Sequence, residues 1–461
     1  MLAPVLFIFC FVYIILELPK RTIRIGNKKV EFIGISIDSR TTQPGNLFFG
    51  LSGKSLNGNQ FAIDAIEKGA SAAVIDDASF IRDSRFILVK NSLETLKETG
   101  LYIRNLVKPK TVIGITGSVG KTTTKLWLNE ILNHRYMAFA SENNYNTIYG
   151  IPICFSMLRD GTEFCILEFG TNCRGEILDL TKYAKPDIGI ITNIFESHIG
   201  CFNNKSEIVL EKISIIDGIA AGGTLIYDGD SEFAAEIKSA ADFKNLRTIS
   251  VGFSDECSVH VKSGTSVEIT TDRETFRYES KCHGRHYEYI SACVIGTLIA
   301  LNLEVSTFLP FFKNLKPLKG RGEVINCVCN GKRFTVIDGS YNASLTSMLA
   351  SINVLSSYDG AKVAIIGQMK ESGSYDVEYH DIVARELSKI HDIMQIYFIG
   401  ERKLWRIFED IHITTTCFEI LDKESIVHII ELLPINSIVL LKGSNSIGLV
   451  KFIEYIKGSG L

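Results

Sequence analysis

The sequence predicts an α/β protein with three domains: a small α/β domain, a central domain with a phosphate-loop type of parallel sheet, and a C-terminal Rossmann-like α/β domain. The chain has 461 residues, which fits two to four domains at roughly 100 to 200 residues each. Short β-rich runs alternate with helical segments, an order typical of parallel sheets covered by helices. The alternation restarts at Phe334, which indicates a second open α/β domain.

The expected domain boundaries lie where turn-forming residues interrupt these patterns. Between the central and last domains, Pro317 and Gly320 break a helical pattern, as residues near a linker do. An apolar stretch at the amino terminus stands apart from the first domain. The expected segments are 1–24, 25–108, 109–314 and 315–461.

The expected elements follow from apolar runs and helical periodicity. In the first domain a helix is expected from Phe61 to Gly69, where glycine ends it. In the central domain we expect three strands and one helix, at Thr111–Gly117, Phe164–Phe169, Ile188–Ile191 and Lys121–Leu132 respectively. In the last domain the expected strands are Phe334–Asp338, Lys362–Gly367, Ile396–Gly400 and Ser437–Gly443, and the expected helices are Ser347–Leu355 and Asp381–Ile390.

Composition excludes some classes of protein. With 49 Lys+Arg against 52 Asp+Glu the formal net charge is -3, so the chain has no overall basic field and nucleic acid is not expected as a partner. Apolar residues make up 46% and charged residues 22% of the chain, values ordinary for a folded globular protein. The 11 cysteines form no Cys-x-x-Cys pair, which favours reduced thiols in a cytoplasmic protein.

The amino terminus resembles a membrane segment. Residues 1–16 are uncharged and nearly all apolar, and Lys20, Arg21 and Arg24 follow them. A spanning helix needs about 20 apolar residues, and a signal peptide carries positive charge before its apolar stretch. Three interpretations therefore stay open: an anchor that contacts the membrane, a buried helix, and a start codon assigned too far upstream. In each case the rest of the protein is expected in the cytoplasm.

A glycine-rich turn between a β-rich run and a helix predicts a site for nucleotide phosphates. Glycines allow backbone N–H groups to point at phosphate oxygens, and the start of the helix adds partial positive charge. Lys121 would neutralise phosphate charge, and the Thr122 hydroxyl would face Mg²⁺. Ile115 stands where the strict motif has glycine, so the loop is a shorter variant. Its expected ATP-binding residues are Gly117, Ser118, Val119, Gly120, Lys121, Thr122 and Thr123.

Two further side chains could serve a metal ion beside this loop. Glu168 ends the apolar strand Phe164–Phe169, and His198 follows the strand Ile188–Ile191. Carboxylate oxygens are ligands that Mg²⁺ prefers. Each residue taken alone also fits an ordinary solvated position at a strand end or in a loop.

Taken together, these motifs and others along the chain resemble the Mur ligase superfamily, and the match runs from about Gly34 to Lys457. The run GISIDSRTTQPGNLFFGLSG starting at Gly34 resembles the family's first domain, in which the Asp-Ser-Arg element lies where the UDP end of the substrate binds. Asn144-Tyr145-Asn146, followed by Gly150-Ile151-Pro152, resembles a further family element. The resemblance therefore implies substrate-binding roles for Asp38, Ser39, Arg40, Asn144 and Asn146.

The resemblance also implies the metal site. The family's metal carboxylate falls on Glu168 and its metal histidine on His198. A lysine that CO₂ carbamylates to hold a second Mg²⁺ falls on Lys212, with the register left open by Glu211 beside it and by Ser214. The catalytic set implied by the resemblance is Lys121, Lys212, His198 and Glu168, and the metal set is Thr122, Glu168, His198 and carbamylated Lys212.

In the last part of the chain the resemblance holds with departures. Gly320-Arg321 and the run Asp338-Gly339-Ser340-Tyr341-Asn342-Ala343 are similar to elements that close over the nucleotide, which implies ATP-binding roles for Arg321, Asp338 and Asn342. Gly284-Arg285-His286 is similar to an element that ends the central domain. Residues that differ from the family pattern, with uncertain effects on binding, are Tyr287, Ile290, Gly339, Gln368 and Asn445.

The resemblance implies an ATP-dependent amide ligase. The run Ser340-Tyr341-Asn342-Ala343 favours the members that add D-alanyl-D-alanine to UDP-N-acetylmuramoyl-tripeptide through an acyl phosphate, with ATP and Mg²⁺, in peptidoglycan precursor synthesis. Two alternatives stay open. One is a related Mur-type or folylpolyglutamate-type ligase that adds another amino acid, and the other is a binding relative without catalytic activity.

Overall fold

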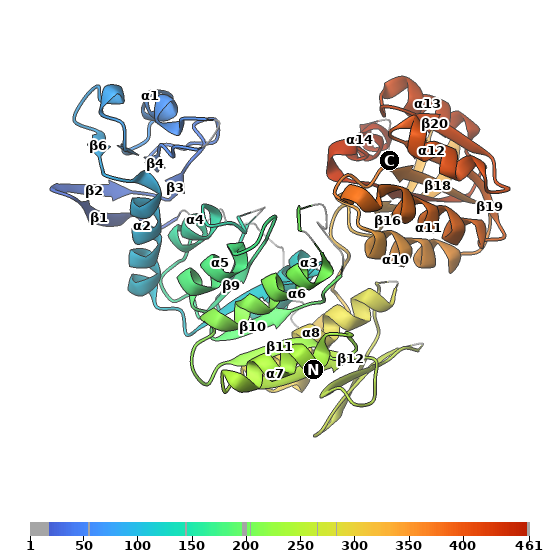
Figure 1. The fold of residues 1–461 in the computed structure, drawn as a ribbon, viewed down its shortest axis with the longest axis horizontal. Coiled ribbons are helices and arrows are strands. Elements are labelled where there is room, and N and C mark those ends of the chain that lie inside the picture. The colour runs from blue at the N-terminus through green and yellow to red at the C-terminus, as the bar shows by residue number, and fades with distance from the viewer. Residues whose placement is uncertain are drawn as a thin grey trace, which may run out of the picture. The chain divides into compact units, whose positions relative to one another are not determined.

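The computed structural model describes residues 18–53, 56–142, 145–195, 201–202, 204–264, 266–282 and 284–458 (Figure 1). The chain divides into two compact units, one comprising the chain up to Pro109 with Tyr149–Thr162, the other Lys110–Ile148 with Glu163 onward. The apolar residues 1–16 lie outside the described part. Within the described ranges, no helix has the length and hydropathy to cross a membrane.

The first unit is a small α/β structure. Phe48, Ala73, Ile75 and Phe86 of its sheet pack with Ile66 of a helix in a buried core. Its second sheet is a two-stranded antiparallel hairpin. The hairpin strands are β1 Arg21–Ile25 and β2 Lys28–Phe32, the parallel strands in spatial order are β3 Ile35–Ser36, β4 Leu47–Phe49, β5 Ala72–Ile75 and β6 Phe86–Leu88, and the helices are α1 Ala62–Glu67, α2 Ser92–Val107 and α4 Gly150–Ser156.

The second unit begins with a nine-stranded sheet in the order β15-β14-β13-β12-β11-β10-β7-β9-β8. From β8 to β13 all neighbours are parallel, and β14 and β15 extend the sheet antiparallel. The strands are β7 Thr111–Thr116, β8 Ala138–Ala140, β9 Phe164–Glu168, β10 Ile188–Ile191, β11 Thr224–Asp228, β12 Arg247–Gly252, β13 Val259–Lys262, β14 Val267–Thr271 and β15 Thr275–Tyr278.

Helices cover both faces of this sheet. Trp127 and Leu128 of α3 pack with the apolar side of α8 and with strand residues Ile113 and Ile190 in one buried cluster. On the other face α5 lies on β7, and α7 lies on β11 and β12 (Figure 1). The helices are α3 Lys121–Asn133, α5 Glu176–Ala184, α6 Lys205–Ile213, α7 Ala234–Phe243, α8 Arg285–Ala300 and α9 Leu309–Phe312.

A six-stranded sheet in the order β16-β17-β21-β18-β19-β20 forms the last part of the chain. Only β16 is antiparallel to its neighbour within this sheet as described. Helices α13 and α14 share a buried core with one face of the sheet. The strands are β16 Glu323–Cys329, β17 Lys332–Gly339, β18 Lys362–Gly367, β19 Ile393–Ile399, β20 Thr415–Phe418 and β21 Ser437–Lys442, and the helices are α10 Leu345–Ser356, α11 Asp376–Ser388, α12 Arg402–Glu409, α13 Lys423–Leu432 and α14 Val450–Gly458.

The predicted α/β class with largely parallel sheets is confirmed, with corrections to individual elements. Helix α11 begins at Asp376, five residues before the predicted Asp381, because its first turn carries the mixed residues Asp-Val-Glu-Tyr and lacks a clear apolar period. Strands β14 and β15 were not predicted, because their inward residues alternate with polar ones such as Glu268 and Arg277. Antiparallel strands with one solvated face have this alternation and no continuous apolar run.

Candidate active site

The predicted phosphate loop lies between β7 and α3 and depends on two glycines. Gly117 has φ of 144°, and a Cβ there would lie 1.9 Å from Thr192 Oγ1. Gly120, at φ of 84°, precedes the first residue of α3. Side chains are disfavoured at such φ values, and at Gly117 a side chain is also excluded by its neighbour. The loop can therefore bring its backbone close to a ligand.

The end of strand β10 holds the loop in shape. The backbone N–H groups of Ser118 and Val119 donate to Asn193 O at 3.0 Å and to Asn193 Oδ1 at 2.9 Å. Thr192 Oγ1 donates to Val119 O at 2.7 Å. Thr192 and Asn193 were not predicted as site residues, yet they directly follow β10, the strand next to β7. The ends of parallel neighbours meet at one edge of a sheet.

The cation of Lys121 points into the loop. Its Nζ donates to Gly117 O at 2.6 Å and to Ser118 O at 3.2 Å. Burial lowers the pKa of Lys121, and the charge of Arg321 lowers it further against the opposing effect of Glu168. A partly buried ammonium at the start of a helix is suited to phosphate oxygens.

Glu168, at the end of β9, lies at the centre of a polar cluster. Thr122 Oγ1 donates to Glu168 Oε2 at 2.9 Å, and Asn146 Nδ2 donates to Oε1 at 3.2 Å. Lys125 Nζ lies 3.2 Å from Oε2. Burial acts to raise the pKa of Glu168, but the charges of Lys125 and Lys121 and the hydrogen bonds hold it below its ordinary value. The carboxylate is thus ionised beside the phosphate loop.

This donor set fits a magnesium ion. Mg²⁺ is usually bound through one or two carboxylates, waters and substrate phosphates rather than by a full protein cage. The Thr122 hydroxyl and the Glu168 carboxylate supply two hard oxygens at one point beside the loop. Among the described residues no group of three or more His, Cys, Asp and Glu could hold a metal. His198, the other predicted ligand, lies outside the described residues.

Arg321 reaches the same cluster. Its Nη2 donates to Thr122 Oγ1 at 3.1 Å, and its guanidinium stacks 4.0 Å above the ring of Tyr341. The Tyr287 hydroxyl donates to the backbone carbonyl of Arg321. Of the three predicted nucleotide residues in the last part of the chain, Arg321 is thus the one that contacts the Thr122–Glu168 pair.

Asp338 and Asn342 instead shape the loops beside Arg321. Asp338 is buried, and its carboxylate accepts the backbone N–H groups of Gly320 at 3.2 Å and Ser340 at 3.0 Å. Asn342 O accepts from Lys442 Nζ at 2.8 Å. Burial, followed by the charge of Arg321, lowers the pKa of Lys442 to about 8. Contact of Asp338 and Asn342 with a nucleotide stays a prediction.

Glu211 and Lys212 are neighbours in α6 but contact different parts of the site. Glu211 accepts hydrogen bonds from the backbone of Gly175 at 2.6 Å and Ile177 at 2.8 Å, at the start of α5. Lys212 is buried, and burial together with the charge of Lys121 lowers its pKa to about 7. Glu211 therefore binds the N–H groups at the start of α5. Lys212 lies close enough to Lys121 for the charge of Lys121 to lower its pKa.

Two residues of α8 that differ from the family pattern, Tyr287 and Ile290, pack near the phosphate loop. The ring of Tyr287 stacks on Trp127 with centroids 5.5 Å apart. The side chain of Ile290 lies 3.8 Å from the position that a Cβ on Gly120 would take. Both residues therefore pack against the phosphate-loop helix or its start.

Three residues near the six-stranded sheet also differ from the family pattern, and each has close neighbours in the structure. Gln368 Nε2 donates to Glu401 Oε1 at 3.2 Å and its Oε1 accepts from Glu401 N at 3.3 Å, so an acid at this position would repel Glu401. A Cβ on Gly339 would lie 3.0 Å from Leu441 O and 3.1 Å from Lys442 Cδ. Asn445 N donates to Asn342 Oδ1 at 3.4 Å.

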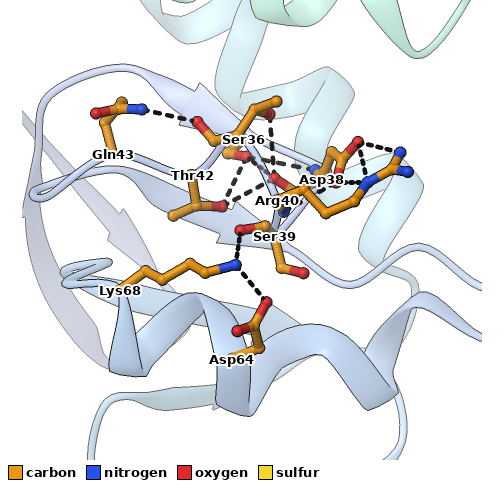
Figure 2. Close-up of polar contacts among 9 residues, drawn as sticks. Ser36, Asp38, Ser39, Arg40, Thr42, Gln43, Asp64 and Lys68 are labelled. Carbon is orange, nitrogen blue, oxygen red and sulfur yellow. Dashed lines mark hydrogen bonds and ion pairs between the residues drawn. The ribbon is translucent and has the colours of Figure 1, made fainter.

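In the first unit the predicted Asp-Ser-Arg element forms a compact turn (Figure 2). Arg40 donates through its backbone N–H and its side chain to Asp38, with an Nη2–Oδ2 distance of 2.6 Å. Lys68 Nζ donates to Ser39 O and to Asp64 Oδ2, both at 2.9 Å (Figure 2). The Arg40 guanidinium is exposed and paired with the Asp38 carboxylate, and binding of the UDP end at this turn stays a prediction. Asn144, another predicted substrate residue, lies outside the described residues.

Comparisons with known proteins support the family. The Mur ligase family, catalytic domain, matches residues 31–107, the Mur ligase middle domain matches 115–302, and the Mur ligase, glutamate ligase domain, matches 320–445. The UDP-N-acetylmuramoyl-tripeptide--D-alanyl-D-alanine ligase of Rickettsia prowazekii is 30% identical over 434 residues, which are 91% of this chain and 94% of that protein. The chain belongs to the Mur ligase family.

Solved Mur ligases share the fold. MurF from Acinetobacter baumannii aligns with a TM-score of 0.82 at 24% identity, covering 94% of this chain and 95% of that one. MurF from Thermotoga maritima in complex with ADP aligns with a TM-score of 0.79 at 23% identity, covering 92% of this chain and 97% of that one. The predicted family and three-domain fold class are confirmed.

Proposed function

We propose that this Mur ligase joins D-alanyl-D-alanine to UDP-N-acetylmuramoyl-tripeptide with ATP in peptidoglycan precursor synthesis. Its relatives from Rickettsia prowazekii and Bacillus subtilis carry the name of this activity. The observation that carries the proposal is the convergence of the phosphate loop, the Thr122–Glu168 pair and Arg321 at one point. No observation favours a ligase for another amino acid or a binding relative without activity.

The reaction requires activation of a carboxylate. The tripeptide carboxylate attacks the γ-phosphorus of ATP, the bond to the β-phosphate oxygen breaks, and ADP leaves. The amine of D-alanyl-D-alanine then attacks the acyl phosphate, forms the amide bond and expels phosphate. Catalysis of phosphoryl transfer rests on positioning and charge stabilisation.

The residues around the loop supply that stabilisation. We infer that the backbone around Gly120, at the start of α3, and the ammonium of Lys121 hold the phosphates, while the N–H groups of Ser118 and Val119 bind Asn193 and keep the loop in shape. Thr123 is buried in the first turn of α3. Arg321 adds a second cation from the last part of the chain. A bound Mg²⁺, held by Thr122 and Glu168 with His198, would neutralise phosphate charge during transfer.

Lys212 is proposed as the carbamylated lysine. Carbamylation needs a neutral amine, whose nitrogen bonds to the carbon of CO₂ and loses a proton. With a pKa of about 7, Lys212 has a large neutral fraction at physiological pH, unlike an ordinary lysine. The carbamate would provide oxygen for a second Mg²⁺.

The remaining assignments concern the substrate ends and the domains. We propose that Asp38, Ser39 and Arg40 bind the UDP end, and that Asn144 and Asn146 also bind the substrate. Segments 25–108, 109–314 and 315–461 are the proposed substrate, ATP-binding and ligase domains. Nucleotide-linked substrates place the proposed reaction in the cytoplasm, and contact of residues 1–16 with a membrane stays a prediction.

The proposal is tested by following phosphate release and product mass with ATP, UDP-N-acetylmuramoyl-tripeptide and either D-alanyl-D-alanine or single amino acids. Ligation of the dipeptide and not of D-alanine, L-lysine or L-glutamate is expected. Lys121→Ala should abolish it, since that change removes the cation from the loop. Ligation of a single amino acid instead, or undiminished turnover by Lys121→Ala, contradicts the proposal.

A further inference from the structure

Lys125 is a buried lysine in the active site to which neither the motifs nor the proposed mechanism gives a role. Its side chain is 1% exposed, and its Nζ lies 3.2 Å from Glu168 Oε2. The Glu168 side chain is 6% exposed. A buried ammonium is costly without a partner of opposite charge. Among the described carboxylates, Glu168 is the one paired with it.

The helix places Lys125 on the same side as the predicted magnesium hydroxyl. Thr122 and Lys125 are three residues apart in α3, so their side chains lie one above the other. Both bind the same oxygen, Glu168 Oε2, at 2.9 and 3.2 Å. The ammonium therefore stands beside the oxygen that would bind a divalent cation.

We propose that Lys125 is a positioning residue that acts as the resident counter-cation of Glu168. It holds the carboxylate next to Thr122 before a metal binds, and its charge opposes entry of a divalent cation without a nucleotide. This inference rests on the proposed function, in which Glu168 holds Mg²⁺.

The charges around Glu168 support this role. Lys125, Lys121 and Arg321 bring three cations to the Thr122–Glu168 pair. A bare Mg²⁺ would add two positive charges to this group, whereas Mg²⁺ on a nucleotide arrives with a net negative charge. At short range in a partly buried site the repulsion between such charges is much stronger than in bulk water. Metal and nucleotide are thus expected to bind together.

The experiment measures binding of Mn²⁺ alone to the full-length protein, by electron paramagnetic resonance of free Mn²⁺, for wild type, Lys125→Met and Lys125→Arg. Removal of the charge should tighten Mn²⁺ binding at least about tenfold, while Lys125→Arg stays near wild type. Lys110→Met is the matched control because Lys110 pairs with Glu163 at 2.5 Å on the surface. Its Mn²⁺ binding should not change.

Two further variants separate this role from packing and from failure of the proposed function. In the double variant Lys125→Met with Glu168→Gln, the tighter Mn²⁺ binding of Lys125→Met should vanish. If Lys125→Met lowers the melting temperature, the double variant should restore it, because no unpaired charge remains. Unchanged or weaker Mn²⁺ binding by folded Lys125→Met overturns the proposal. If Lys125→Met does not fold, a double variant that also fails to fold overturns it. Glu168→Gln alone tests the proposed metal site: if it keeps wild-type ligation and Mg²⁺ dependence, that assignment fails whatever Lys125 does.

Discussion

The Tyr287 hydroxyl donates a hydrogen bond to the backbone carbonyl of Arg321. Tyr287 belongs to α8 of the nine-stranded sheet, and Arg321 precedes the first strand of the six-stranded sheet. Trp127 strengthens the connection, since its ring stacks on Tyr287 and its Nε1 donates to Lys316 O at 2.9 Å. The linker that carries Arg321 is therefore held by the helix layer behind the phosphate loop.

Tyr287→Phe removes this hydrogen bond and keeps the ring stack on Trp127. A hydrogen bond of this kind contributes about 0.5–1.5 kcal/mol, so we expect kcat to fall by up to about tenfold with little change in the KM for D-alanyl-D-alanine. Steady-state kinetics of Tyr287→Phe, Arg321→Ala and the double variant measure the effect. If Tyr287 acts through Arg321, the double variant equals Arg321→Ala, whereas additive losses would contradict this.

Gly117→Ala tests the shape of the phosphate loop. A methyl group there meets Thr192 Oγ1 at 1.9 Å in addition to the strain of φ 144°, whereas Gly175 has φ of 94° with no atom within 4 Å of a Cβ. Gly175→Ala should therefore show the backbone strain alone, about 1–2 kcal/mol. Gly117→Ala should destabilise more and lose nucleotide binding, as urea unfolding and calorimetric titration with ATP can measure. Equal losses of stability in the two variants would show that the loop can relax around the methyl group.

The sequence was most informative where one short segment contains the whole feature. Gly117, Gly120 and Lys121 lie within five consecutive residues that join β7 to α3, so the strand, loop and helix around them were predictable. Thr192 and Asn193, which hold that loop, lie more than 70 residues later in the chain, directly after β10. Their role depends on β10 being the neighbour of β7, and sheet order is not a local property of the sequence.

Lys125 and Glu211 show a second limit. In the sequence each is an ordinary charged residue of a helix, where a solvated face is the common outcome. Burial decides otherwise, because Lys125 faces Glu168 and Glu211 faces the start of α5. The direction of a helical side chain depends on which side of the helix the sheet covers, and this is settled by packing of the whole domain.

Glu211→Ala is predicted to affect stability more than nucleotide binding. The change leaves the buried N–H group of Ile177, the partly buried N–H group of Gly175 and the Thr171 hydroxyl without this acceptor. The cost is about 1–3 kcal/mol for an unsatisfied buried group, seen as a lower free energy of unfolding in urea. Affinity for ATP should stay near wild type in calorimetric titration. A large loss of affinity with unchanged stability would instead place Glu211 among the ligand-binding groups.

Lys212→Met is predicted to change the pH dependence of stability in buffer freed of CO₂. The folded pKa of about 7 lies below the ordinary value of 10.5, so between these values the unfolded chain holds a proton that the folded chain has released. Wild-type stability should therefore rise with pH across this window, by up to about 1.4 kcal/mol per unit. Below pH 7 burial of the charged amine destabilises the wild type fully, and there the methionine variant should be more stable than wild type by its largest margin. Urea unfolding of both proteins from pH 6 to 10 measures the difference, and a margin that stays constant with pH would mean that Lys212 titrates as an ordinary lysine.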